Sequence, residues 1–160
     1  MKVLITYYSK TGNTKKLAEE IEKGVKEEGV NCVIKPVSDV TKEDLVSSQG
    51  IIIGSPVYFG SMAAEVKKMI DNFVGVRKKM DGKIGAAFAT SGDESGGKET
   101  TIMSILQAML IYGMIIVGDP LDATGHYGTS CVGAPDVETI KNAAKLGKRV
   151  AMLVKKISGP

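Results

Sequence analysis

The chain has 160 residues and a net charge of +3, with 43% apolar and 24% charged residues. This composition is ordinary for a globular protein and predicts a single domain over residues 1–157, followed by a polar tail over residues 158–160. It argues against a membrane-inserted protein, since no apolar run approaches ~20 residues, and against nucleic-acid binding, since the aromatic residues do not stand among the lysines.

Two features indicate the compartment and the metal content. The chain passes from Met1 directly into an apolar run, without a charged-then-apolar leader, so we expect a cytoplasmic protein. Cys32 and Cys131 lie far apart and show no CxxC spacing, which argues against a disulfide framework and against a metal site.

Short, nearly continuous apolar runs alternate with stretches of helical period. Such runs are typical of strands covered on both faces, and they predict strands at residues 2–7, 30–35, 50–54, 84–89 and 114–117. The intervening stretches place apolar residues every three or four positions, as amphipathic helices do. The expected inner-face residues are Leu17, Ile21 and Val25, then Val66, Ile70, Phe73 and Val74, then Ile102, Ile105, Leu106, Met109 and Leu110, and finally Ile140, Ala144, Gly147, Ala151 and Val154.

A weaker segment, residues 41–48, predicts a short helix capped by Thr41, with Asp44 three residues further on. Five alternations of strand and helix predict an α/β fold, a doubly wound five-stranded parallel sheet inside a three-layer α/β/α sandwich. In such sheets, ligands bind outside the carboxyl ends of the strands. We therefore look for a site in the loops after the first, third and fourth strands.

The loop after the first strand carries groups that suit a phosphate. Its residues are Ser9, Lys10, Thr11, Gly12, Asn13 and Thr14. The hydroxyl and amide side chains can donate to phosphate oxygens, Gly12 lets the backbone approach closely, and the unpaired N–H groups at a helix start favour an anion. The same kind of cluster also forms ordinary turns, in which Thr11 or Asn13 is only a helix cap.

The other two loops offer a place for a flat body. The third strand is followed by Pro56, Val57, Tyr58, Phe59 and Gly60, and the fourth by Thr90, Ser91, Gly92, Asp93, Gly96 and Gly97. A ligand with its phosphate on the first loop would place its body between these two, against aromatic surface on one side and backbone N–H groups on the other. The alternatives are that the aromatic pair is a hydrophobic plug and that the glycine-rich loop is merely flexible.

Together these segments resemble the flavodoxin-like flavoproteins, over nearly the whole chain. Residues 9–14 are similar to the loop of that family that holds the FMN phosphate. Residues 56–62 resemble the P-x-x-F-G-x-M segment of the WrbA-type NAD(P)H:quinone oxidoreductases. Residues 90–92 and 96–104 resemble their S-T-G…G-G-x-E-x-T-x-M-S segment, and residues 112–117 continue the match.

The resemblance implies the strand order 2-1-3-4-5 and a non-covalently bound FMN, held by the residues of the three loops named above. It implies an enzyme that passes electrons from NAD(P)H to a quinone or similar acceptor, possible assembly into a homo-oligomer, or alternatively a flavodoxin-type carrier between redox partner proteins. A flavin-free binding domain is the third alternative.

The chain departs from both subgroups. WrbA-type proteins tend to carry histidines near residues 111–112 and are longer, whereas carrier flavodoxins are usually strongly acidic. The single histidine, His126, lies in a segment that resembles the WrbA-type loop on the substrate side. It is a candidate proton donor to the substrate, or simply a surface residue.

Overall fold

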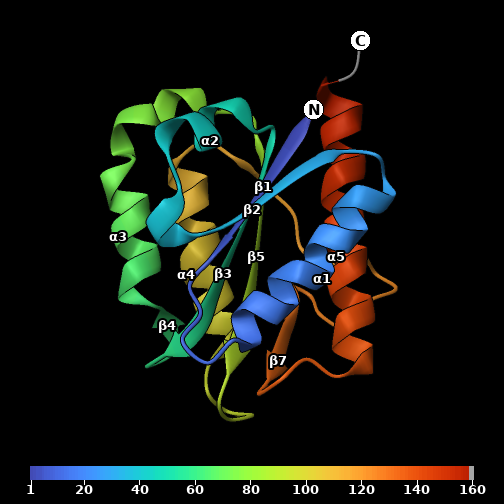
Figure 1. The fold of residues 1–160 in the computed structure, drawn as a ribbon. Coiled ribbons are helices and arrows are strands. Elements are labelled where there is room, and N and C mark those ends of the chain that lie inside the picture. Colours follow the sequence, from blue (N-terminus) through green and yellow to red (C-terminus); the bar gives the residue numbers. More distant parts are fainter. Residues whose placement is uncertain (159–160) are drawn as a thin grey trace.

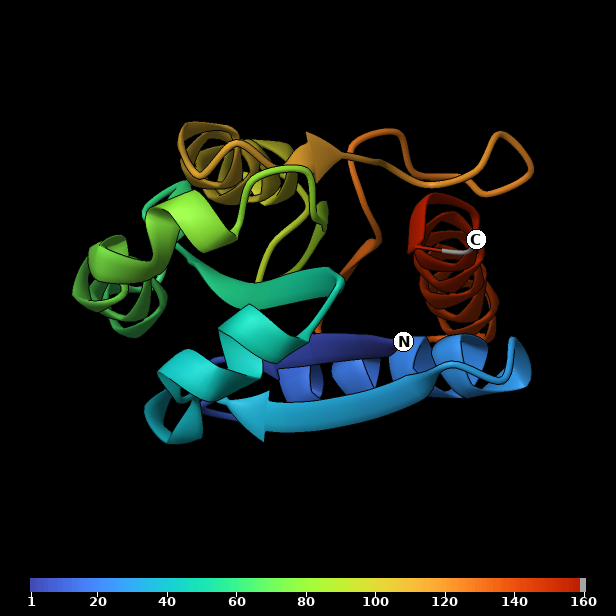
Figure 2. The same cartoon turned by 90° about the horizontal axis from the view of Figure 1, so that it is seen from above.

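The computed structural model describes residues 1–158 and shows a sheet between two layers of helices (Figure 1 and Figure 2). Five strand positions follow the order β2-β1-β3-β5-β6, and each neighbouring pair is parallel. The predicted fold and the implied order 2-1-3-4-5 are thus confirmed. The strands are β1 (Lys2–Tyr7), β2 (Asn31–Pro36), β3 (Gly50–Tyr58), β5 (Ile84–Ser91), β6 (Ile115–Ile116) and β7 (Ser130–Val132), with a short antiparallel β4 (Ser61–Met62) against β3.

The helices divide between the two faces of the sheet. One face is covered by α1 (Asn13–Glu27) and α5 (Val137–Ser158) (Figure 1). The other is covered by α2 (Lys42–Ser47), α3 (Ala64–Asn72) and α4 (Lys98–Ile111), together with the 3-10 turns η1 (Val37–Asp39) and η2 (Val74–Lys79). The carboxyl ends of the parallel strands meet at one edge, and the candidate loops lie there.

The fifth strand differs from its prediction, because it consists of two separate pieces. β6 pairs with the beginning of β5, Ile115 opposite Ile84, whereas β7 pairs with its end, Ser130 opposite Ala89. Between the two pieces the chain leaves the sheet over residues 117–129. This excursion brings polar residues to the carboxyl edge, where an unbroken strand would have carried only its own short loop.

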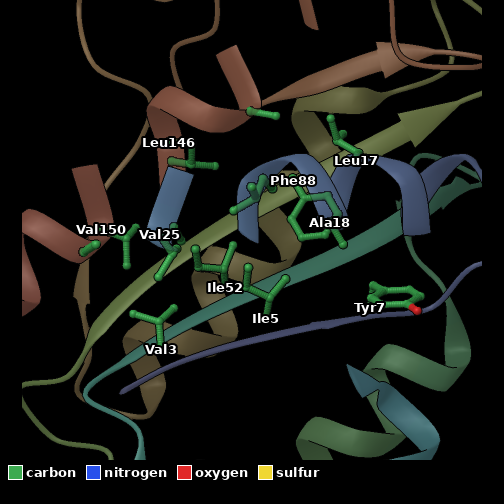
Figure 3. Packing of buried hydrophobic residues seen from close by; sticks show 14 of the residues in the cluster. Val3, Ile5, Tyr7, Leu17, Ala18, Val25, Ile52, Phe88, Leu146 and Val150 are labelled. Atoms are coloured by element: carbon green, nitrogen blue, oxygen red, sulfur yellow. The ribbon is translucent and has the colours of Figure 1, made fainter. Parts of the chain in front are cut away.

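The core between the sheet, α1 and α5 contains fully buried side chains from all three (Figure 3). Phe88 at its centre is completely buried, as are the predicted inner-face residues Leu17 and Ile21. The two helices touch through glycines. A Cβ on Gly24 would lie 1.9 Å from the carbonyl oxygen of Ala144, and one on Gly147 would lie 2.1 Å from that of Ile21. α1 is therefore fixed against α5 backbone to backbone, so no larger side chain fits at either glycine.

Three predicted inner-face residues are exposed instead: Val74, Leu110, and Ile140, which is 37% exposed in the first turn of α5. Val74 is 65% exposed, because α3 ends at Asn72 and the following 3-10 turn changes the period that placed Val74 inside. Leu110 is 58% exposed, because it lies in the last turn of α4, at the side of the sheet where the two-residue β6 gives little cover.

The predicted cap of the short helix is confirmed. The Thr41 hydroxyl accepts a hydrogen bond from the Asp44 N–H at 3.2 Å, and the Asp44 carboxylate accepts one from the Thr41 N–H at 2.9 Å. Burial acts to raise the pKa of Asp44, but hydrogen bonds from Lys35 and Thr41 outweigh it and bring the pKa to about 2.

At the other end of the chain, α5 continues through Ser158, which the sequence places in the tail. The remaining two tail residues lie outside the part of the chain that the structure describes. Among the described helices, none combines the length and the apolar character needed to cross a membrane.

Candidate functional site

The loop between β1 and α1 forms an open cradle at the start of a helix. Gly12 precedes α1 with a φ of +96°, a conformation that favours glycine, and no atom lies within 4 Å of the position a Cβ would take. The Ser9 hydroxyl accepts hydrogen bonds from the N–H groups of Gly12, at 3.2 Å, and Lys15, at 3.3 Å, which holds the loop in shape. The N–H groups of the first helical turn have no carbonyl partner within the helix, so the cradle suits an anion.

Thr14 differs from its neighbours in the loop, because it is turned inward. Its side chain is only 2% exposed, and its hydroxyl lies 2.8 Å from the hydroxyl of Thr90, which is 5% exposed. This buried contact joins the first loop to the end of β5. Thr14 thus has a partner inside the protein, whereas Thr11 is exposed at the loop surface.

The residues after the third predicted strand form a hairpin, not a loose loop. β3 extends through Pro56 and Val57 to Tyr58, and β4 returns alongside it, with Tyr58 opposite Ser61. Phe59 lies at the turn with a φ of +51°, and its side chain is fully exposed. The hydrophobic-plug alternative is therefore wrong for Phe59, which offers an aromatic surface at the carboxyl edge of the sheet.

An aromatic pair lies beside this hairpin. The rings of Tyr8 and Tyr58 meet edge to face, with centroids 6.3 Å apart and an angle of 73° between planes. Two effects raise the pKa of Tyr8: its hydrogen bond with Glu65, which is the larger, and its burial. Tyr8 was not among the predicted site residues, because it precedes the phosphate-loop pattern.

The glycine-rich loop after β5 is ordered by Asp93. The Ser91 hydroxyl and the Gly96 N–H donate to the Asp93 carbonyl oxygen, at 2.7 and 3.2 Å, and the Ser95 N–H donates to the Asp93 carboxylate at 3.2 Å. Thr90 and Ser91 are the last residues of β5 and directly precede this loop. The Asp93 carboxylate is thus occupied in shaping the loop, and Gly92 remains exposed at its tip.

The hairpin and the glycine-rich loop are in direct contact. The Thr100 hydroxyl donates to the carbonyl oxygens of Gly60, at 2.6 Å, and Gly97, at 3.0 Å. A Cβ on Gly97 would lie 2.9 Å from the Cα of Gly60, so the close approach requires glycine at position 97. Further along α4, the Ser104 hydroxyl accepts the Met62 N–H at 3.3 Å. The structure therefore brings together the two segments that carry the family resemblance.

Two hollows flank the three loops. The larger, about 770 Å³, lies between the first loop and α3, where Lys10 and Gly12 face Lys68. The smaller, about 240 Å³, lies on the other side of the glycine-rich loop and contains His126, which is exposed and stands on the segment between β6 and β7. His126 thus lies in a different hollow from the one that Lys10 and Gly12 of the first loop line. The sequence missed the buried residues that surround it there, Asp119 and Asn142.

The fold and these loops define a doubly wound α/β protein with an open loop at a helix start and an aromatic hairpin at the switch point of the sheet. Comparisons with known proteins narrow this class. The sequence model of the family described as NADPH-dependent FMN reductase matches residues 38–128.

Two curated relatives and one solved structure are similar over almost the whole chain. A flavodoxin of Aquifex aeolicus is 38% identical over 158 residues, covering 94% of this chain and 85% of the relative. An NAD(P)H dehydrogenase (quinone) of Archaeoglobus fulgidus is 31% identical over 188 residues, covering 98% of each. A WrbA-like flavodoxin structure from Agrobacterium tumefaciens superposes with a TM-score of 0.84 at 20% identity, covering 97% of this chain and 98% of that one, which shows a shared fold.

The chain belongs to the flavodoxin-like family of FMN redox proteins, which includes flavodoxins and NAD(P)H:quinone dehydrogenases. The resemblance noted from the three sequence segments is confirmed.

Proposed function

We propose that this protein binds FMN non-covalently at the three joined loops and passes electrons from NAD(P)H to a quinone or similar acceptor. The observation that carries the proposal is the pair of contacts that assembles the loops. Thr14 meets Thr90, and Thr100 meets Gly60 and Gly97. These contacts fix a phosphate cradle, an aromatic hairpin and a glycine-rich loop at one edge of the sheet.

The residues present fit FMN. Its phosphate would lie at the start of α1, where the open face beside Gly12 leaves room and the N–H groups of the first turn favour an anion. Its ring system would lie against Tyr58 and Phe59, since an exposed aromatic surface provides a stacking partner. FMN supplies the redox chemistry, and the chain supplies binding and orientation.

The backbone of residues 91–97 would donate hydrogen bonds to the polar edge of the flavin ring. Hydrogen bonds to Asp93 shape this loop and occupy the N–H groups of Ser95 and Gly96, so the other N–H groups of the loop would be the donors. N–H donors at that edge favour negative charge, so they stabilise a reduced, anionic ring more than a neutral one.

NAD(P)H as electron donor and a quinone as acceptor are supported by the family and by its members' names. The matched family is described as NADPH-dependent, and the Archaeoglobus fulgidus relative is named a quinone dehydrogenase. The protein would work in the cytoplasm, where its two free thiols remain reduced. Burial raises the pKa of Cys32 to about 12 and that of Cys131 to about 11, so both are unreactive at neutral pH.

The test begins with the visible spectrum of the purified protein after addition of FMN. A two-band flavin spectrum that differs from that of free FMN is expected, followed by NADPH oxidation with a benzoquinone and no partner protein. Phe59→Ser should weaken FMN binding, whereas Val74→Ser, at another exposed apolar residue just after the end of α3, should not. Absence of binding at saturating FMN would overturn the proposal.

A carrier role between protein partners is the second candidate, because the Aquifex aeolicus relative is named a flavodoxin. In that case the one-electron-reduced form of the bound flavin should accumulate during reductive titration, and NADPH should not be consumed without a partner protein. Size-exclusion chromatography with light scattering tests the remaining question of assembly, for which we propose a homo-oligomer.

A further inference from the structure

A turn on the segment that joins β6 to β7 presents a fully exposed leucine. Residues 120–123 form this turn, in which the Ala123 N–H donates to the Pro120 carbonyl oxygen at 2.9 Å. Leu121, directly after Pro120, is 103% exposed. Turns favour glycine, proline, asparagine, aspartate and serine, so the turn itself does not require a leucine at this position. The reason for the exposed side chain must therefore lie outside the turn.

Two cationic side chains of α5 fix the turn in place. The Lys145 ammonium group lies 3.1 Å from the Asp122 carboxylate, and Arg149 donates to the Asp119 carbonyl oxygen at 2.8 Å. In Figure 2 the segment from β6 to β7, drawn in orange, runs beside α5. These anchors lie on both sides of Leu121 in the chain. The leucine thus has a defined position before any partner arrives, and this lowers the entropic cost of association.

An apolar hollow of about 350 Å³ lies directly beside this leucine. Pro120, Met152 and Leu153 supply its apolar surface, and Met152 is 52% exposed. Pro120 and Asp122, the two chain neighbours of Leu121, both line the hollow, so the leucine stands at its rim without filling it. A single exposed apolar side chain is common on protein surfaces. An apolar anchor beside an apolar pocket is instead the combination from which protein interfaces are built.

The charges around the hollow are complementary to the charge beside the leucine. Three cationic side chains of α5 line the hollow, and one of them, Lys148, is 50% exposed. Lys148 and Lys155 share the single carboxylate of Glu28, at 3.6 and 2.5 Å, so positive charge remains unbalanced there. Asp122, next to Leu121, carries the opposite charge, and its side chain is 72% exposed. An apolar side chain with an adjacent carboxylate thus matches an apolar hollow with a cationic rim.

We infer that a second copy of this chain docks on this surface, with Leu121 of each copy in the hollow of the other and Asp122 of each beside Lys148 of the other. The chain carries both halves of the contact, and a two-fold axis between two copies brings each half to its counterpart. This contact rests on the homo-oligomer proposed above, which it makes a two-fold dimer, and it is independent of FMN.

The first test measures the mass of the purified full chain by sedimentation and light scattering over a range of concentrations. A dimer that dissociates on dilution is expected. Leu121→Ala should raise its dissociation constant about a hundredfold, because each dimer loses two leucine contacts that count about tenfold each. Leu121→Asp should leave only monomer. Leu110→Asp is the matched control, since Leu110 is a leucine that is 58% exposed in the last turn of α4, and it should leave the dimer intact.

Two results of this test would overturn the inference. A monomer at every concentration up to about 1 mM would show that a second copy does not bind. A dimer that persists in Leu121→Asp would show a contact elsewhere on the chain, and its loss in Leu110→Asp alone would place that contact at the end of α4. The circular dichroism spectrum and FMN binding of Leu121→Asp should equal those of the wild type, because the side chain is exposed and remote from the three joined loops.

A pair of charge reversals tests the two-fold arrangement without changing the apolar contact. Asp122→Lys alone brings like charges together at both contacts of the dimer, and Lys148→Asp alone does the same, so each variant by itself should be monomeric. A mixture of the two variants places opposite charges at both contacts and should form a dimer with one chain of each kind, which native mass spectrometry identifies by its mass. Absence of this mixed dimer, or wild-type dimerisation of either variant alone, would contradict the arrangement.

The inference and the proposed redox function fail separately. If a chain that stays monomeric binds FMN and oxidises NADPH, the dimer contact and the proposed assembly fail and the redox function stands. If the mixed dimer forms but FMN does not bind, the redox function fails and the dimer contact stands. A dimer unaffected by Leu121→Asp leaves the homo-oligomer in place and removes only this contact.

Discussion

The buried contact between Thr14 and Thr90 offers a direct test of how the candidate site is assembled. Their hydroxyls lie 2.8 Å apart, and the residues are 2% and 5% exposed. Replacing either by valine keeps the shape but leaves the other hydroxyl unpaired in the interior. Each single variant should therefore lose about 1 to 2 kcal/mol of unfolding free energy. For a chain of this size that is a fall of about 2 to 8 °C in melting temperature.

The double variant, with valine at both positions, should be more stable than the sum of the two single changes predicts. Neither valine carries a hydroxyl, so no buried group is left without a partner, and the double-mutant cycle should show a coupling of about 1 kcal/mol or more. Chemical denaturation of the four proteins without FMN measures it. Additive losses would refute the interpretation that the two hydroxyls bond to each other.

The same variants distinguish an internal role of Thr14 from contact with a phosphate. Because its hydroxyl is turned toward Thr90, Thr14→Val and Thr90→Val should change the dissociation constant of FMN to a similar, small extent. A loss beyond tenfold, about 1.4 kcal/mol, in Thr14→Val alone would contradict this geometry. It would show that the hydroxyl turns to the phosphate when FMN binds.

Three further predictions concern the fold around the site. Lys83→Met should destabilise the protein by about 1 to 3 kcal/mol in chemical denaturation. The Lys83 ammonium group donates to carbonyl oxygens at the end of α2, two of them at 2.6 and 3.0 Å, and without these hydrogen bonds the oxygens are left unpaired. The free energy of unfolding should decrease as the pH falls from about 4 to about 2, because the folded pKa of Asp44 is about 2 against an ordinary 3.8. Lys35→Met should reduce this pH-dependent loss by about 1 kcal/mol after allowing for solvent screening. Urea denaturation at a series of pH values measures both effects. Phe59→Gly should raise the free energy of unfolding by about 1 kcal/mol, because glycine adopts the positive φ of +51° without strain. The same variant should weaken FMN binding in a fluorescence titration. A variant that binds FMN as tightly as the wild type would exclude Phe59 from the flavin site.

The pattern of apolar runs was sufficient to predict the five strand positions, since strands covered on both faces must be apolar throughout. The same runs could not show that the fifth position is shared by β6 and β7. β7 is only Ser130–Val132, too short to carry a pattern, and it is a strand because the end of β5 offers it a partner. Strand pairing between distant segments decides such an element, and a local pattern does not contain it.

The three loops were visible in the sequence because phosphate cradles and tight turns require particular residues. What joins the loops was not visible. Thr100 and Ser104 look like ordinary polar positions of a helix, and only the closeness of Gly60 and Met62 in space gives them partners. Asp119 and Asn142 come from segments that are separate in the sequence, so neither signals a hollow by itself.

The glycine contacts between α1 and α5 tie the two ends of the chain to each other. The loop before α1 leaves the ribosome well before α5, the helix that braces α1, because strands β2 to β7 and helices α2 to α4 lie between them in the chain. A nascent chain therefore carries the complete loop sequence long before it can hold that loop in place. Cofactor loading should follow the emergence of α5, and a chain that stops short of α5 would be colourless although every predicted loop residue is present.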